Sequence, residues 1–119
     1  MSSTQEDQSA PTELYAVAVC LIPMGLDTPS VGPQIAECQR ILKKSGLTYQ
    51  IGGYGTNVEG PWSQVMAVIG ECHQAVHKMG TPRIATDIRI GTRTDKQIAP
   101  GQGNLGKVAR VKEILEKDP

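Results

Sequence analysis

The segment RIATDIRIGTR, residues 83–93, alternates two kinds of side chain along its length. One set is largely apolar and comprises Ile84, Thr86, Ile88 and Ile90. The other set holds the charged residues Arg83, Asp87, Arg89 and Arg93. A period of two predicts a β-strand with one apolar face and one charged face. The charged face is therefore either ordinary solvated surface or a functional site.

A second strand is predicted well before this one, in the continuous apolar run LYAVAVCLI, residues 14–22. The run is short for a helix and rich in valine, which favours a central strand buried on both faces. Ala16, Ala18 and Cys20 point to the same side and would leave a shallow apolar depression there. Residues 47–55 and 56–60 are predicted to pair as a hairpin with a tight turn near Gly55.

Two helices are predicted from apolar residues at helical spacing. The first is capped by Ser30, has Pro33 in its first turn, ends at Gly46, and carries the stripe Val31, Ile35, Cys38 and Leu42. The second begins at Pro61, ends at Gly80, and carries the stripe Val65, Ile69, Cys72, Val76 and Met79. A final helix is expected over residues 107–117, after a loop over residues 94–106.

The predicted order is strand, helix, strand, strand, helix, strand and a last helix. This order is typical of the split βαβ, ferredoxin-like arrangement, an α+β fold. We expect a βαββαβ antiparallel sheet with two helices on one face, plus a C-terminal helix. One domain is predicted over residues 13–119, after a polar, disordered tail over residues 1–12.

The composition narrows the class of protein. Lys plus Arg and Asp plus Glu both total 12, which argues against a nucleic-acid binder held by a positive field. Low net charge is compatible with self-association. Neither a membrane-spanning run nor a secretory signal is present, so no membrane partner is expected. Three cysteines without a close repeat predict reduced thiols in a cytoplasmic protein, each a small buried hydrophobe.

The open face of the predicted sheet is the first candidate for a functional surface. If the isoleucines of residues 83–93 pack under the helices, Asp87 and Arg89 fall on the opposite side. Burying an unpaired carboxylate costs roughly several kcal/mol, so a covered Asp87 needs Arg89, a partner subunit or a ligand. Because the first strand is apolar on both sides, we expect oligomerisation with a pocket at or near the covered face.

Four segments resemble the small YkoF-like thiamine-binding protein family of microbes and fungi. They are ECQRILKKSGL (37–47), GTNVEG (55–60), ECHQAVHKMG (71–80) and TDIRIGTRTD (86–95). The resemblance extends over about residues 14–117. It implies a ferredoxin-like fold that pairs into dimers and commonly tetramers. It also implies binding of thiamine or a related pyrimidine, with no catalytic reaction assigned. We expect no cofactor.

The resemblance also carries candidate ligand-binding residues. The match to GTNVEG points to Thr56 and Glu59, and the match to TDIRI points to Thr86, Asp87 and Arg89. A carboxylate offsets the thiazolium charge of thiamine and accepts from its exocyclic amine. Asp87 is therefore the first candidate and Glu59 the second, while Thr56 and Thr86 can supply neutral hydrogen bonds.

Each candidate has a structural alternative. Asp87 and Arg89 are equally well explained as an intersubunit salt bridge. Glu59 is also suited to capping the next helix or to facing solvent. The aromatic candidates for stacking on a cationic ring are Tyr49, Tyr54 and Trp62. Of these, Trp62 fits packing beside the apolar stripe of its helix better than stacking.

Other chemistry has weaker support. His73 and His77 are one helical turn apart, but no acid stands between them as in metalloproteases, and no metal is expected. Cys72 has no basic partner in a suitable direction, which argues against a nucleophilic role. The segment GQGNLG, residues 101–106, lacks the ending of a phosphate-binding loop and is predicted to be a flexible loop.

We therefore predict a non-enzymatic, oligomeric, cytoplasmic protein that binds thiamine or a thiamine precursor. Storage, transport or sensing are the expected uses of such binding. One alternative is an enzyme that acts on a small metabolite in the same pocket. The other is a structural interaction protein whose charged face is only an interface between subunits.

Overall fold

The computed structural model describes residues 13–21 and 31–118. Its elements are β1 (Tyr15–Leu21), α2 (Gly32–Ser45), β2 (Thr48–Gly52), β3 (Gly55–Pro61), α3 (Trp62–Lys78), β4 (Asp87–Gly91) and α4 (Gln102–Glu116). The strands of this part of the chain form an antiparallel sheet in the order β2-β3-β1-β4. This topology confirms the predicted ferredoxin-like fold, with β1 and β3 at the centre.

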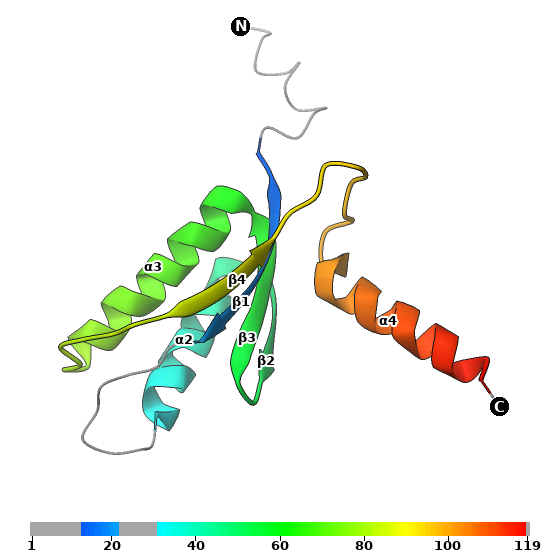
Figure 1. Cartoon of the computed structure of the whole chain (residues 1–119). Helices are drawn as coiled ribbons and strands as arrows, with labels where there is room; N and C mark the ends of the chain where they lie inside the picture. Colours follow the sequence, from blue (N-terminus) through cyan, green and yellow to red (C-terminus); the bar gives the residue numbers. More distant parts are fainter. Residues whose placement is uncertain (1–12, 22–30, 119) are drawn as a thin grey trace, which may run out of the picture.

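The two faces of the sheet are covered differently. Helices α2 and α3 lie side by side on one face, whereas α4 lies on the opposite side of the sheet (Figure 1). The face toward α2 and α3 is named the helix face, and the other is named the open face. The predicted placement of the first two helices on a single face is confirmed.

The core lies between the helix face and the two helices. On the sheet side it includes small residues of β1. Ala16 and Ala18 are completely buried. Ala18 lies opposite Val58 on β3 and Ile90 on β4, and the cluster continues to Val65 of α3. Because alanine has so short a side chain, the helices pack close to β1, and the predicted depression on this side of the strand is filled.

The other face of β1 differs from the prediction. Val19 is 38% exposed and lies opposite Arg89 on β4, so β1 is not buried on both faces in the single chain. The predicted alternation in the last strand is correct for Ile90, which packs on the core, and for Arg89, which is exposed on the open face. It is wrong for Ile88, which is 39% exposed and not buried under the helices. Strand β4 is shorter than residues 83–93, and Ile84 makes only an isolated bridge before it.

The ends of α2 and α3 follow the signals in the sequence. Helix α2 stops at Gly46, whose φ of 79° is a left-handed conformation that glycine adopts without strain. Pro61 is the N-cap of α3, which ends at Lys78. Met79 therefore lies past the helix and is 44% exposed, so it does not extend the buried stripe. The predicted cap Ser30 and the predicted tail 1–12 lie outside the described residues.

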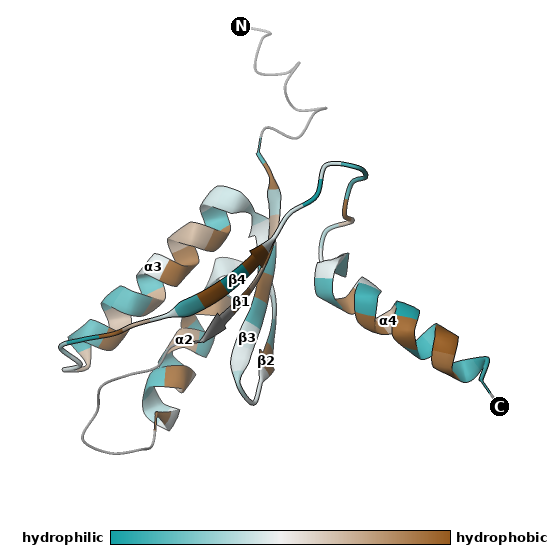
Figure 2. Ribbon diagram, in the orientation of Figure 1, coloured by the Kyte–Doolittle hydropathy of each residue, from teal (hydrophilic) through white to brown (hydrophobic). Residues whose placement is uncertain are grey.

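Helix α4 corrects the prediction for the glycine-rich segment. It begins at Gln102, so residues 102–106 are helical rather than a flexible loop. Five large apolar side chains of α4 are 42–61% exposed: Leu105, Val108, Val111, Ile114 and Leu115. Figure 2 shows hydrophobic bands along α4, which extends away from the sheet. Across the part of the chain that the structure describes, no helix is long and apolar enough to cross a membrane.

Candidate ligand-binding cavity

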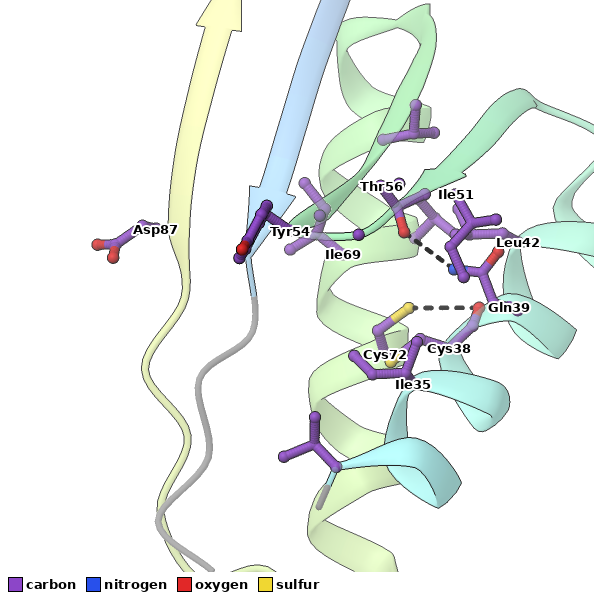
Figure 3. Close-up of a pocket in the computed structure, with 16 residues that line it drawn as sticks. Ile35, Cys38, Gln39, Leu42, Ile51, Tyr54, Thr56, Ile69, Cys72 and Asp87 are labelled. Carbon is purple, nitrogen blue, oxygen red and sulfur yellow. Dashed lines mark hydrogen bonds between the residues drawn. The ribbon is translucent and has the colours of Figure 1, made fainter. Parts of the chain in front are cut away.

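A cavity of about 380 Å³ lies where the β2–β3 turn meets α2 and α3 (Figure 3). This volume is at the lower end of the range for small-molecule sites and suits a ligand of one or two small rings. Its lining residues are mostly apolar: Val31, Ile35, Cys38, Gln39, Leu42, Ile51, Gly52, Gly53, Tyr54, Gly55, Thr56, Val58, Val68, Ile69, Cys72 and Asp87. The cavity is on the helix face, not on the open face where the sequence led us to expect a pocket.

A hydrogen-bonded polar pair is set into this apolar wall. Gln39 of α2 donates from Nε2 to Oγ1 of Thr56 on β3, over 2.9 Å. This bond leaves the Gln39 carbonyl oxygen oriented as an acceptor and the Thr56 hydroxyl hydrogen available as a donor. The pair thus offers one acceptor and one donor side by side, and it includes the predicted site residue Thr56.

The turn between β2 and β3 forms part of the rim. Gly52 pairs with Gly55, so Gly53 and Tyr54 form a two-residue turn. A Cβ on Gly52 would lie 2.9 Å from the Gly55 carbonyl oxygen, which explains the glycine there. Tyr54 lines the cavity but is 92% exposed, so an aromatic ring is placed at the entrance.

Two cysteines lie next to each other in the cavity wall. The Cys72 thiol of α3 donates to the backbone carbonyl of Cys38 on α2, over a sulfur–oxygen distance of 3.9 Å. The side chains are 3% and 4% exposed for Cys38 and Cys72, respectively. A hydrogen bond from the Cys72 side chain lowers the pKa of the Cys38 thiol and outweighs the opposing effect of burial.

Asp87, the first candidate from the sequence, lies at the edge of the cavity. Figure 3 shows its carboxylate pointing away from the other lining side chains, as expected from the alternation that also directs Arg89 to the open face. The side chain is exposed. Among the described residues it makes no ion pair, and neither does Arg89, whereas Arg93 is paired with Asp95.

Glu59, the second candidate, serves a different structural purpose. It is 3% exposed on the open face, opposite Val17 and Thr48. Its carboxylate accepts hydrogen bonds from the backbone N–H groups of Gly103 and Asn104, at 2.7 and 2.9 Å. These groups belong to the first turn of α4, so the carboxylate caps that helix and balances its dipole.

Tyr15 completes this capping network. Its hydroxyl donates to Glu59 Oε2 at 2.6 Å and accepts from the backbone N–H of Gly101 at 2.9 Å. Burial, followed by the hydrogen bond to Glu59, raises the pKa of Tyr15 to about 12. The phenol therefore stays protonated over the physiological range and joins the start of α4 to β1.

Thr86 and the two histidines belong to a third region. His73 Nε2 and Thr86 Oγ1 are 2.6 Å apart, and His77 Nδ1 lies 2.8 Å from the carbonyl oxygen of Thr81. These contacts hold the segment before β4 against α3. Within residues 13–21 and 31–118, no group of three or more histidine, cysteine, aspartate or glutamate side chains could hold a metal ion.

Only Thr56 and Asp87 of the five predicted site residues therefore lie at the cavity. Of the aromatic candidates, Tyr49 packs against the core and Trp62 is 39% exposed at the start of α3. Sequence reasoning missed Gln39 and the pair of cysteine side chains. Little in the sequence indicates Gln39, because a polar residue that follows a residue of the apolar stripe is common on any amphipathic helix.

These features define a ferredoxin-like domain with an apolar cavity and a donor–acceptor pair in the cavity wall. A family model described as thiamine-binding protein matches residues 17–117. The chain belongs to this family, as its sequence motifs led us to expect.

Several relatives are similar to this chain in sequence, and their names describe no activity. A UPF0045 protein of Synechocystis is 46% identical over 80 residues, which are 67% of this chain and 65% of that protein. A UPF0045 protein of the fungus Eremothecium gossypii is 41% identical over 81 residues, 68% of this chain and 77% of that protein.

Solved structures support the fold. A hypothetical protein of Methanocaldococcus jannascii has a TM-score of 0.72 and 22% identity, covering 83% of this chain and 97% of that one. A Thermotoga maritima protein provisionally assigned to thiamine biosynthesis or salvage has a TM-score of 0.65 and 15% identity, covering 79% and 98%. At these identities, the likeness concerns the architecture alone.

Proposed function

We propose that this protein binds thiamine or a thiamine-related pyrimidine in the cavity between α2, α3 and the β2–β3 hairpin, without catalysing a reaction on it. The Gln39–Thr56 pair in the apolar wall is the observation that carries the proposal. Family membership supports the ligand class. The cavity volume supports a ligand of this size.

The pair matches one edge of an aminopyrimidine. That edge presents an exocyclic amine, which donates, next to a ring nitrogen, which accepts. The amine donates to Oε1 of Gln39, while the ring nitrogen accepts from the hydroxyl of Thr56. The apolar side chains of Ile35 and Ile69 then cover the faces of the ring.

The cationic thiazolium ring of thiamine is better placed at the entrance. Asp87 is the only formally charged side chain among the described lining residues, and it points outward. Transfer of a fixed cation into an apolar cavity without a counter-charge is unfavourable. In this arrangement Tyr54 lies near the thiazolium ring, and Asp87 attracts its charge from the edge of the cavity.

The side chains that line the cavity are suited to binding a ligand and not to catalysing a reaction on it. The described wall contains an amide, hydroxyls and thiols, but no histidine, lysine or arginine. Its one carboxylate points away from the interior. A general acid or base must lie within hydrogen-bonding reach of the reacting group, and the described wall has no imidazole, amine or inward-pointing carboxylate that does so.

Calorimetry with two ligands tests this arrangement. Thiamine and an aminopyrimidine that lacks the thiazolium ring should both bind the wild type, and Thr56→Val should weaken both, by about tenfold for one lost hydrogen bond. Asp87→Asn should weaken thiamine only, with Arg89→Gln as a matched control on the same strand. Absence of heat with both ligands, or unchanged binding by Thr56→Val, would overturn the proposal.

We further propose that a second copy covers the open face and that the protein works as a dimer or tetramer in the cytoplasm. Val19 is 38% exposed there, and the apolar stripe of α4 is exposed along its length. A helix with so many exposed apolar side chains is unusual on a monomer. Light scattering should give a multiple of the chain mass, and Val111→Glu should reduce it. A wild-type monomer at micromolar concentration would contradict this part.

A further inference from the structure

Cys38 and Cys72 are the nucleophilic side chains that the proposed binding does not use. They come from different helices, α2 and α3, and meet in the cavity wall (Figure 3). The Cys72 sulfur is 3.9 Å from the backbone oxygen of Cys38. The two side chains also affect each other, because an interaction with Cys72 lowers the pKa of the Cys38 thiol.

The surroundings of Cys38 make its thiol easier to deprotonate than that of an ordinary buried cysteine. Burial alone would raise the pKa of its thiol. The hydrogen bond from Cys72 has the opposite and larger effect, and it lowers the pKa of Cys38. The thiolate is the form of cysteine that reacts with oxidants, so Cys38 is the better nucleophile.

The cavity gives a small oxidant access to both sulfurs. Each side chain is almost fully buried, so a protein or a bulky reagent does not reach it directly. Both residues nevertheless line the cavity. A molecule the size of hydrogen peroxide can therefore approach from the same space that the ligand is proposed to occupy.

We propose that Cys38 and Cys72 form a redox-active dithiol, which a hydroperoxide converts into a disulfide between α2 and α3. In the oxidised form the cavity has a covalent bond across its wall, and ligand binding changes. The effect of the disulfide on ligand binding rests on the proposed function, whereas the formation of the disulfide does not.

The reaction balances in two steps. The Cys38 thiolate attacks one peroxide oxygen, the O–O bond breaks, and a sulfenic acid forms while hydroxide or alkoxide leaves and takes up a proton. The Cys72 sulfur then attacks the Cys38 sulfur, the S–O bond breaks, and water leaves with the thiol proton. Overall, two thiols and one hydroperoxide give one disulfide, one water and one further water or alcohol.

Ligand and oxidant are expected to compete. A ligand that fills the cavity blocks the approach of peroxide to the sulfurs. At a ligand concentration about ten times Kd, about a tenth of the protein has an empty cavity, so oxidation should slow about tenfold. If the disulfide weakens binding, linkage requires that bound ligand disfavours the disulfide by the same factor.

The first experiment follows the disulfide without any ligand. The Cys20→Ser variant keeps only this pair, because the chain has three cysteines. After treatment with hydrogen peroxide, its mass under non-reducing conditions should fall by two hydrogen atoms while the protein stays one chain. Adding Cys72→Ala removes both the second thiol and the interaction that lowers the pKa of Cys38. The reaction should therefore be slower and should stop at a sulfenic acid on Cys38, which a cyclic diketone traps. Adding Cys38→Ala should leave Cys72 largely unmodified.

The outcomes separate the two proposals. Unchanged thiols in folded Cys20→Ser protein, or a disulfide only between chains, would overturn the dithiol. Circular dichroism of each variant, and the same treatment of protein unfolded in urea, show whether the reaction needs the native fold. The second experiment repeats the oxidation with thiamine. A disulfide that forms equally fast with calorimetrically proven bound thiamine would overturn the competition, while absent binding would count against the proposed function alone.

Discussion

The carboxylate of Glu59 accepts a hydrogen bond from the backbone N–H of Gly103 at 2.7 Å, on the open face of the sheet. A residue in β3 thus holds the first turn of α4 through Gly103, which is 44 positions further along the chain. The backbone N–H of Asn104 and the hydroxyl of Tyr15 complete the coordination of the same carboxylate. This arrangement gives the buried acid a capping role that does not require any ligand.

Replacing Glu59 should release the start of α4. In Glu59→Gln, an amide nitrogen takes the place of one of the oxygens that face the three donors, so we expect a loss of about 2 kcal/mol in the free energy of unfolding. Urea denaturation measures this loss, and amide exchange at Gly103 and Asn104 should accelerate. The control Glu37→Gln removes an exposed pair with Arg40 and should change stability by less than about 0.5 kcal/mol.

Two glycines of α4 should respond to alanine in opposite directions. A Cβ on Gly103 would lie 2.5 Å from Val17 Cγ2 and 2.8 Å from Glu59 Oε2, so Gly103→Ala should destabilise by roughly 1–3 kcal/mol. A Cβ on Gly106 would have only ordinary contacts with Gln102, so Gly106→Ala should stabilise the helix by about 0.5–1 kcal/mol. Urea denaturation with circular dichroism checks both, and equal effects would contradict the close packing of Gly103.

Alkaline pH should weaken the Tyr15–Glu59 contact. The pKa of Tyr15 is raised from its ordinary 10.0 to about 12 in the folded protein. Its contribution to stability is therefore complete below pH 10 and is lost as the pH rises toward 12. The difference in unfolding free energy between wild type and Tyr15→Phe should shrink over this interval. A constant difference would show that the phenol proton does not stabilise the fold.

Thr86 should matter for stability but not for ligand. Its hydroxyl is 2.6 Å from Nε2 of His73, and it does not line the cavity. Thr86→Val should cost about 1 kcal/mol of unfolding free energy and leave thiamine affinity within twofold or so. Thr92→Val, at an exposed position beyond β4, is the matched control. A large loss of thiamine affinity in Thr86→Val would restore Thr86 as a ligand contact.

Much of the fold could be predicted because its signals are local. The stripe of α3, with Val65, Cys72 and Val76, is visible as helical spacing, and all three residues are buried. The alternation around Arg89 and Ile90 correctly separates the two faces of β4. The start of α4 could not be predicted in this way, because glycines disfavour a helix locally and the stabilising carboxylate lies in β3.

The site was less predictable because its parts are brought together only by the fold. Gln39 and Thr56 are 17 positions apart, and neither is distinctive by itself. Alternation correctly places Asp87 on the open face, but the cavity lies on the helix face, where no pocket was expected. Glu59 was singled out for its motif, yet its burial depends on the later helix that it caps.

Strand β3 carries a constraint on how the chain can change. Val58 forms part of the cavity wall, and the adjacent Glu59 points to the opposite side and holds α4. A one-residue insertion or deletion in β3 would exchange these orientations, placing a carboxylate in the cavity and a valine under the helix. Insertions and deletions should therefore be tolerated between the elements but not within β3, where a single change of length would disrupt both the cavity wall and the attachment of α4.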